Sequence, residues 1–238
     1  MKGSAPELIA EVRDGVAWIT FNRPQKANAL TIEMLQGLEK LLDNYTVDDS
    51  VRAVVLTATG TRTFSAGADL TPAAENPEAH RAQRRAQFSA ALFALLDFSK
   101  PAIAAVNGAA CGAGMMLAVL CDAVIAAKAA RFSLPEINQG MPTLPGITIV
   151  SQRFDDALAA DLVFSGRFME SDEALRRGVV NQVVASDELP ASAQTLALTL
   201  GRKDARAYAH NKQWLNRTLH YRLAAAVKAS AELHNEIP

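Results

Sequence analysis

The stretch that decides the fold is Asn107-Gly108-Ala109-Ala110-Cys111-Gly112-Ala113-Gly114-Met115-Met116-Leu117-Ala118-Val119-Leu120-Cys121-Asp122. It follows residues 101–106, a short apolar run that predicts a buried strand, and it ends in residues 115–120, which are apolar on every side. The pattern therefore predicts a strand, a tight turn and a buried helix. Glycines in the turn let a ligand approach the start of the helix, where free N–H groups attract anions. The alternative is that these small residues only let the helix pack tightly on the sheet, and both interpretations stay open here.

Composition limits the classes of protein to consider. Of 238 residues, 50% are hydrophobic and 21% are charged, which is ordinary for one large globular domain with a sizeable core. The formal net charge of −1 gives no electrostatic reason to expect nucleic acid or an anionic membrane as a partner. The two cysteines, Cys111 and Cys121, show neither disulfide nor metal spacing. Without a signal peptide or a membrane-spanning window, we expect a cytoplasmic protein.

Strands and helices alternate along the first half of the chain. Residues 8–13 and 16–21 are strand-like, and Asp14-Gly15 between them predicts a hairpin. Thr31 can cap a helix with one apolar face, and residues 53–56 form a continuous apolar strand. This alternation is typical of an α/β protein with a parallel sheet.

A second glycine-bearing turn, residues 64–70, follows that strand. Loops at the carboxyl ends of parallel strands are where such sheets usually bind ligands, so two such turns could converge on one atom. A helix over residues 80–98 comes next. Its arginines Arg81, Arg84 and Arg85 form a solvated face, or one of them contacts a phosphate.

The second half of the chain contains one carboxylate of interest. Glu136 sits beside a proline among apolar neighbours, and from the residues alone its favoured role is to complement a helix N-terminus. A loop rich in turn residues runs from there to Gly146, and residues 171–178 predict a short helix. The pattern is helical from Asp187 onward. We therefore expect a core of residues 1–185 and a C-terminal helical region of residues 186–238.

The motifs resemble, in order and across nearly the whole chain, those of the crotonase superfamily, which includes the enoyl-CoA hydratases and isomerases. Each motif is weak alone, but the ordered set is highly specific. The motifs are residues 21–24 and 28–30, 64–70, 100–114, Cys121-Asp122, Phe132 with Pro135-Glu136, 165–167, 173–175 and 178–181.

The resemblance implies a spiral of ββα units followed by a C-terminal helical region that covers the site and takes part in oligomerisation, in a trimer or a dimer of trimers. It also implies an acyl-CoA substrate, with coenzyme A as part of that substrate and no bound cofactor or metal. The backbone N–H groups of Ala68 and Ala113 would form an oxyanion hole for a thioester enolate. One such donor is worth about 3 to 4 kcal/mol.

By the same resemblance Glu136 would be the general acid and base, with an apolar setting raising its pKa toward neutral. Lys26 would reach a phosphate, although a solvated loop lysine is an equally good interpretation. The residues expected to contact substrate are Lys26, Ala27, Ala66, Gly67, Asp69, Leu70, Thr71, Gly112 and Met116.

Three departures from the family pattern narrow the expected chemistry. Met116 stands where family hydratases carry a second glutamate, so Glu136 alone favours a double-bond isomerase over a hydratase. The loop from Ile137 to Gly146 is longer than usual, which predicts a reshaped acyl pocket. The sequence ends at Pro238, before the acidic, glycine and aromatic residues that commonly help cover the ligand.

Other functions remain as alternatives. A decarboxylating, hydrolytic or carbon–carbon bond-forming relative would also suit one glutamate and an enolate hole. A protein that binds acyl-CoA without turnover is the non-enzymatic alternative. A nucleophilic role for Cys111 is disfavoured, because this cysteine lies in an apolar run and has no identifiable histidine partner.

Overall fold

The computed structural model of the chain describes residues 6–71 and 75–236. The strands are β1 (Leu8–Arg13), β2 (Val16–Phe21), β3 (Ala53–Ala58), β4 (Thr63–Ser65), β5 (Ala102–Val106), β6 (Ala109–Cys111), β7 (Ala123–Ala127), β8 (Arg131–Ser133), β9 (Met169–Glu170) and β10 (Gln182–Val184). The helices are η1 (Pro24–Lys26), α1 (Ile32–Val47), α2 (Pro77–Asp97), α3 (Ala113–Leu120), η2 (Pro135–Gln139), α4 (Leu144–Arg153), α5 (Asp156–Ser165), α6 (Ser171–Arg176), α7 (Leu189–Gly201) and α8 (Ala205–Glu236), of which η1 and η2 are 3₁₀ helices.

The larger sheet has the strand order β1-β2-β3-β5-β7-β10. Its first pair is antiparallel and the strands from β2 onward are parallel. The predicted hairpin is confirmed: Asp14 and Gly15 both have positive φ angles, of 50° and 77°, which suit the right-handed twist of the flanking strands. Thr31 caps α1 as predicted, since its side chain accepts a hydrogen bond from the Met34 N–H.

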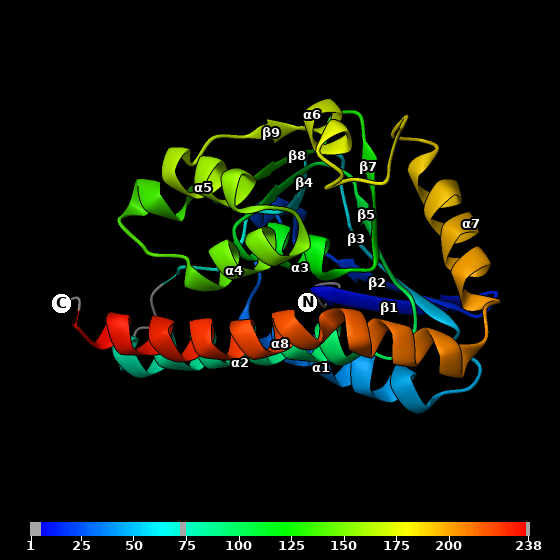
Figure 1. Cartoon of the computed structure of the whole chain (residues 1–238), viewed down its shortest axis with the longest axis horizontal. Coiled ribbons are helices and arrows are strands. Elements are labelled where there is room, and N and C mark those ends of the chain that lie inside the picture. Colours follow the sequence, from blue (N-terminus) through cyan, green and yellow to red (C-terminus); the bar gives the residue numbers. More distant parts are fainter. Residues whose placement is uncertain (1–5, 72–74, 237–238) are drawn as a thin grey trace, which may run out of the picture.

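A smaller sheet, ordered β4-β6-β8-β9, stands beside the first (Figure 1). Each of its parallel strands follows a strand of the larger sheet and precedes a helix, which gives the successive units β3-β4-α2, β5-β6-α3 and β7-β8-η2-α4. This repetition confirms the predicted spiral of ββα units. The three-residue strands were not expected from the sequence, because so short a segment carries no readable alternation.

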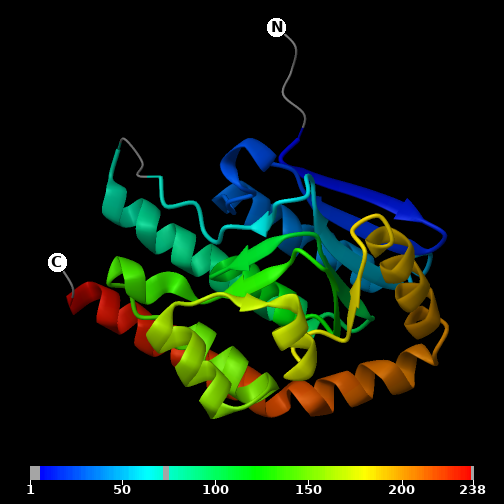
Figure 2. The ribbon, with the colours of Figure 1, turned by 90° about the horizontal axis from the view of Figure 1, so that it is seen from above.

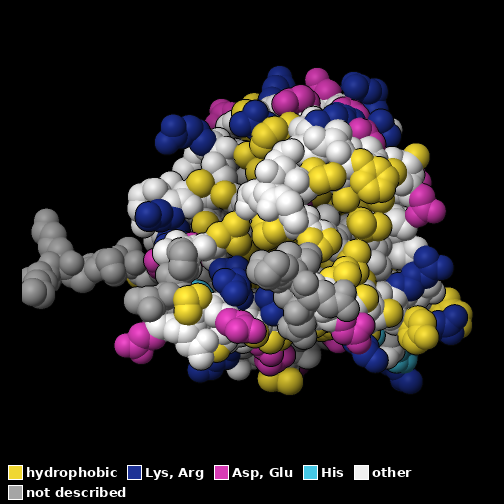
Figure 3. All heavy atoms as spheres, turned by 90° about the vertical axis from the view of Figure 1, so that its left-hand side faces the viewer, with side chains coloured by type: hydrophobic (Ala, Val, Ile, Leu, Met, Phe, Trp, Pro, Cys, Tyr) yellow, Lys and Arg dark blue, Asp and Glu magenta, His cyan; other side chains and the backbone are white. Residues whose placement is uncertain are grey.

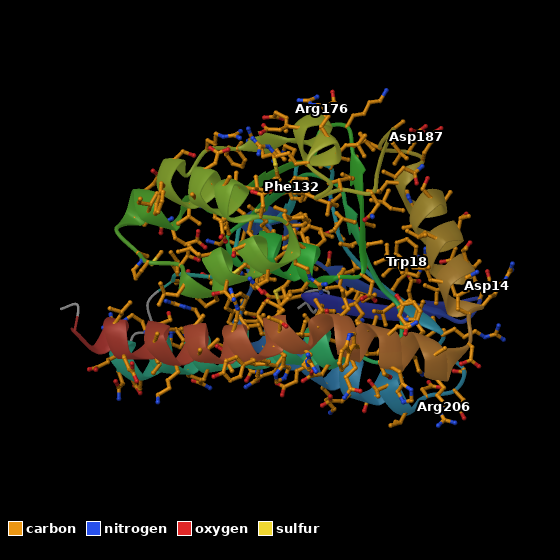
Figure 4. The ribbon with its side chains drawn as sticks, in the orientation of Figure 1. Asp14, Trp18, Phe132, Arg176, Asp187 and Arg206 are labelled. Carbon is orange, nitrogen blue, oxygen red and sulfur yellow. The ribbon has the colours of Figure 1, made fainter. Side chains whose placement is uncertain are left out.

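The two faces of the larger sheet bury alternate residues, as the period of a strand requires. Trp18, Val55 and Ile103 face α7, and Figure 4 shows the labelled Trp18 between the sheet and this helix. The indole N–H of Trp18 donates a 2.7 Å hydrogen bond to Gln194 of α7. The intervening residues, such as Ile19 and Leu56, belong to the main core with α1, α2 and α3.

The last helices confirm the predicted helical character of the C-terminal region, while its boundary at residue 185 stays a prediction. Figures 1 and 2 show α8 running along one side of the molecule beside α2 and α4. Lys212 of α8 is buried, and its Nζ lies 2.8 Å from Asp122 Oδ2 and 3.1 Å from the Lys100 carbonyl oxygen. This contact ties α8 to the strand ends of the core.

The segment after Glu136 differs from the expected loop. A helix, α4, begins at Leu144 and places Pro145 in its first turn, where the missing N–H of proline costs nothing. It packs against α5, which in turn contacts η2. The proline and glycine that predicted a loop to residue 146 therefore start a helix instead.

Candidate active site

The first predicted oxyanion donor, Ala68, lies in a turn whose backbone is fixed on both sides. Leu30 N–H donates to the Gly67 carbonyl at 2.8 Å, and Asp69 N–H donates to the Leu30 carbonyl at 2.9 Å. Ala68 lies between Gly67 and Asp69 and pairs with Leu30 in a parallel bridge. In such a bridge the N–H of Ala68 points away from Leu30. Gly67 has a φ of +101°, and its N–H donates to Ser65 Oγ at 3.1 Å. The Ala68 N–H is thus held outside this ladder.

The second predicted donor, Ala113, is the first residue of α3. N–H groups in the first turn of a helix have no partner within the helix, so this donor needs a partner from outside α3, and its role as an oxyanion donor stays a prediction. A Cβ atom on Gly67 would lie 3.1 Å from the Cys111 carbonyl oxygen and 3.6 Å from the Ala113 nitrogen. The structure therefore brings the two predicted turns into direct contact, although they are 45 residues apart in the sequence.

Glu136 lies against the same helix start. A Cβ atom on Gly112, the residue before α3, would lie 3.0 Å from Glu136 Oε1 and 3.6 Å from its Cδ. Burial raises the pKa of Glu136, and this effect exceeds the opposite influence of its own backbone N–H and of the Thr143 hydroxyl. Its Oε2 is buried and has no hydrogen-bond partner among the described residues. Such a carboxyl group can hold a proton at a higher pH than an ordinary glutamate.

Met116 occupies the next turn of α3. Its backbone N–H donates to the Gly112 carbonyl at 2.9 Å, and its side chain is buried. A thioether neither releases nor accepts a proton. None of the acidic side chains in the described part of the chain contributes to the pKa shift of Glu136.

The glycines of the central stretch have different roles. A Cβ atom on Gly108 would overlap the backbone of Arg62, and one on Gly114 would lie 2.6 Å from Ser65 Cβ. These two glycines serve close packing, as the alternative interpretation held, and the expectation of ligand approach is wrong for them. Gly112 has a φ of +52° and lies against Glu136, so it borders the predicted base, and its contact with substrate stays a prediction.

The loop with Lys26 and Ala27 is joined to the Ala68 turn. The Ala66 N–H donates to the Ala27 carbonyl at 3.0 Å. Asn28 is buried, accepts from the Arg23 N–H at 2.8 Å and donates to the Thr63 carbonyl at 2.8 Å. Lys26 itself is exposed, so its ammonium group is available to an anion.

The carboxylate of Asp69 is engaged within the protein. It accepts from Arg23 Nη1 at 2.8 Å and from the Thr71 hydroxyl at 2.6 Å. Burial raises the pKa of Asp69, but the Thr71 hydrogen bonds and the Arg23 guanidinium outweigh it and lower the pKa to about 2. A substrate contact by Asp69 stays a prediction, and the structure adds Arg23 as the residue that positions it. The only sequence signal for Arg23 was its place in the Asn-Arg-Pro motif.

Large apolar side chains lie next to these positions in the sequence. Leu70 and Ile137, which follow Asp69 and Glu136, are each 44% exposed. Figure 3 shows hydrophobic side chains gathered on the upper part of the face formed by the left-hand ends of the helices in Figure 1, with charged side chains above and below them. Leu70 and Ile137 thus offer accessible apolar surface next to Asp69 and Glu136 in the sequence.

Other site types find no support. Burial raises the pKa of the Cys111 thiol to about 11, a shift that Arg131 opposes and Glu136 reinforces, so this thiol stays protonated at neutral pH. The described residues contain no group of His, Cys, Asp and Glu side chains that could hold a metal ion. None of the helices within residues 6–71 and 75–236 is long and apolar enough to cross a bilayer.

The fold and the paired turns define an enzyme class, and the chain belongs to the enoyl-CoA hydratase/isomerase family, whose model matches residues 11–238. It is 34% identical over 233 residues to the short-chain-enoyl-CoA hydratase of Clostridium acetobutylicum, covering 96% of this chain and 88% of the relative. It is 38% identical over 229 residues to the 2,3-dehydroadipyl-CoA hydratase of Escherichia coli, covering 95% and 88%. The crystal structure of an enoyl-CoA hydratase from Bacillus anthracis superposes with a TM-score of 0.85 at 26% identity, covering 95% of this chain and 90% of the other. The chain is therefore an acyl-CoA-processing enzyme with the crotonase fold.

Proposed function

We propose that this enzyme shifts the double bond of an enoyl-CoA thioester through an enolate, with Glu136 as its single acid and base. The observation that carries the proposal is a buried Glu136 Oε2 without a hydrogen-bond partner among the described residues, next to Gly112 at the start of a helix whose next turn carries Met116 and no carboxylate. One carboxylate suffices to take a proton from one carbon and return it to another. Adding water is helped by a second carboxylate that Met116 cannot replace.

The proposed reaction assigns a role to each group of the site. The N–H groups of Ala68 and Ala113 bind the thioester oxygen and stabilise its negative charge after proton removal. Glu136 removes a proton from C2 of a 3-enoyl thioester, which produces a dienolate, and the same carboxyl group then protonates C4. The raised pKa of Glu136 makes its carboxylate a stronger base, so that it takes the C2 proton more readily than an ordinary glutamate would.

Substrate binding is assigned by the same proposal. The thioester would lie across Ala66, Gly67 and Gly112, and Lys26 and Ala27 would border the coenzyme A portion. Asp69, Leu70, Thr71 and Met116 would border the acyl group. Coenzyme A enters as part of the substrate, and no separate cofactor is needed.

Hydration is the second candidate. The names of the two hydratase relatives support it, and Glu136 Oε2 offers an unused acceptor for a water molecule. With only one carboxylate in the site, we expect slower hydration than isomerisation. A specialised decarboxylating, hydrolytic or carbon–carbon bond-forming activity and binding without turnover remain the alternatives.

Purified protein should be offered 2-enoyl-CoA and 3-enoyl-CoA, with hydration and isomerisation followed separately. Glu136→Gln should lower turnover by about 100- to 10,000-fold while a saturated acyl-CoA still binds. Glu33→Gln, at an exposed position of α1, is the matched control. If hydration is faster than isomerisation, the enzyme is a hydratase, the second candidate, and not an isomerase. Tight binding without turnover of either substrate by the wild type would favour the non-enzymatic alternative.

We also propose that the enzyme assembles as a homotrimer or a dimer of trimers through its C-terminal helices. Trp214, Leu215 and Tyr221 of α8 are at least 70% exposed, and a cavity of about 960 Å³ lies between α8 and the end of α2. Exposed aromatic side chains beside a cavity favour contact with another protein surface. Light scattering after size exclusion tests the assembly, and Trp214→Glu should lower the measured mass.

A further inference from the structure

The N-terminal half of α2 places a half-buried arginine beside the candidate active site. Arg84 Nη1 donates a 3.1 Å hydrogen bond to the carbonyl oxygen of Asp69. Asp69 directly follows Ala68, so the Arg84 guanidinium binds the residue next to the proposed oxyanion donor. Arg81, one turn earlier, is exposed, whereas Arg84 and Arg85 are only partly accessible. The expectation that these arginines form a solvated face therefore fails for Arg84.

The surroundings of Arg84 are rich in positive charge. No carboxylate forms an ion pair with it in the described part of the chain, because that of Asp69 is taken by Arg23 and Thr71. Burial lowers the pKa of Arg84, and so do the neighbouring charges of Arg85 and Arg81, while Asp69 opposes them.

Most of the hydrogen-bonding capacity of Arg84 is unused. A guanidinium has five N–H donors, and the bond to Asp69 is the one recorded within residues 6–71 and 75–236. His80 lies four residues earlier, on the same face of α2, and its Nδ1 is buried without a described hydrogen-bond partner. On this face of α2, His80 Nδ1 thus lacks the partner that a buried polar atom normally has, and Arg84 keeps donors to spare beside it.

We infer that Arg84, supported by the charges of Arg81 and Arg85, binds an anionic oxygen group of the acyl-CoA held at Ala68 and Ala113. The inference rests on the proposed function. The group is a carboxylate or a phosphate, since both match the planar fork of arginine. It comes either from the far end of the acyl chain or from the coenzyme A portion.

Four saturated thioesters separate these sources: hexanoyl-CoA, adipyl-CoA, hexanoyl-pantetheine and adipyl-pantetheine. The adipyl group adds a terminal carboxylate, and pantetheine lacks every phosphate. Calorimetric titration gives the Kd of each for the wild type, Arg84→Gln and Arg84→Lys. Arg176→Gln is the matched control, because Arg176 is exposed on α6, at the top of the view in Figure 4 and far from α2. Circular dichroism checks that each variant is folded.

If the ligand of Arg84 is a terminal carboxylate, Arg84→Gln should weaken the binding of both adipyl thioesters by about 10- to 100-fold and leave the Kd of both hexanoyl thioesters unchanged. If the ligand is a phosphate, Arg84→Gln should weaken the binding of both CoA thioesters to the same extent and leave the binding of both pantetheine thioesters unchanged. Arg84→Lys, which keeps the charge but loses the fork, should lose less in either case. The Arg176→Gln control should match the wild type.

Equal weakening of all four ligands would mean that Arg84 only supports the Asp69 turn, and that result would overturn the inference. No weakening of any ligand would overturn it as well. A wild-type protein that binds none of the four would refute the proposed function itself, which separates that failure from a failure confined to Arg84.

Discussion

Replacing Gly112 by alanine should impair catalysis as well as stability. The residue has a φ of +52° and a ψ of −122°, which an L-amino acid adopts only with strain of about 1 to 3 kcal/mol. The new Cβ would lie 3.0 Å from Glu136 Oε1 and 3.6 Å from its Cδ, so the carboxyl group must move by a few tenths of an ångström. A displacement of about 1 Å costs roughly 100-fold in rate, so this smaller shift should lower kcat by about 10-fold.

Gly178→Ala is the matched control. Gly178 also has a positive φ, of 73°, but a Cβ atom there would meet nothing within 4 Å. Both variants should lose about 1 to 3 kcal/mol of unfolding free energy in urea, while only Gly112→Ala should lose kcat in the 3-enoyl-CoA isomerisation assay. If Gly112→Ala, corrected for its folded fraction, turned over at the wild-type rate, the position of Glu136 beside Gly112 would not be its reacting position.

Three further predictions concern charged groups. Glu136→Gln should lower kcat by about 100- to 10,000-fold. Because burial raises the pKa of Glu136, the acidic limb of the wild-type kcat/KM profile should lie above pH 4.5. A limb at or below that value would contradict the assignment of Glu136 as the base. Lys212→Met should cost about 3 kcal/mol of unfolding free energy, since it leaves Asp122 beside α8 without its cation, and an unchanged urea midpoint would argue against the pair. The lowered pKa of Asp69 contributes stability that is complete above its unfolded value of 3.8 and is lost as the pH falls toward 2. Arg23→Gln should therefore flatten the pH dependence of stability in that window by about 1 kcal/mol, as acid titration of unfolding would show.

The sequence by itself determined the features that depend on local physics. Asp14-Gly15 specified the hairpin through its positive φ angles, and Thr31 specified the start of α1 through its side-chain oxygen. The apolar runs around Val55 and Ile103 predicted strands buried on both faces, which the larger sheet confirms. The ordered motifs then supplied the crotonase fold, because a set of weak patterns in one order is specific even when each pattern is not.

Tertiary structure alone decided which residues meet. Gly108 and Gly114 are needed because the backbone at Arg62 and the side chain of Ser65 come against them from distant strands, and no local pattern reports such an approach. The helix α4 forms where turn residues had predicted a loop, because its apolar face packs on α8 and α3.

The chemistry of the site was also decided by packing. The raised pKa of Glu136 arises from desolvation, and desolvation depends on the elements that close around the carboxyl group and not on its sequence neighbours. The same is true of Arg84, whose sequence suggested a solvated helix face. Folding α2 against the Ala68 turn partly buries the Arg84 guanidinium and directs it to the Asp69 carbonyl, a contact between residues 15 positions apart that exists only in the folded chain.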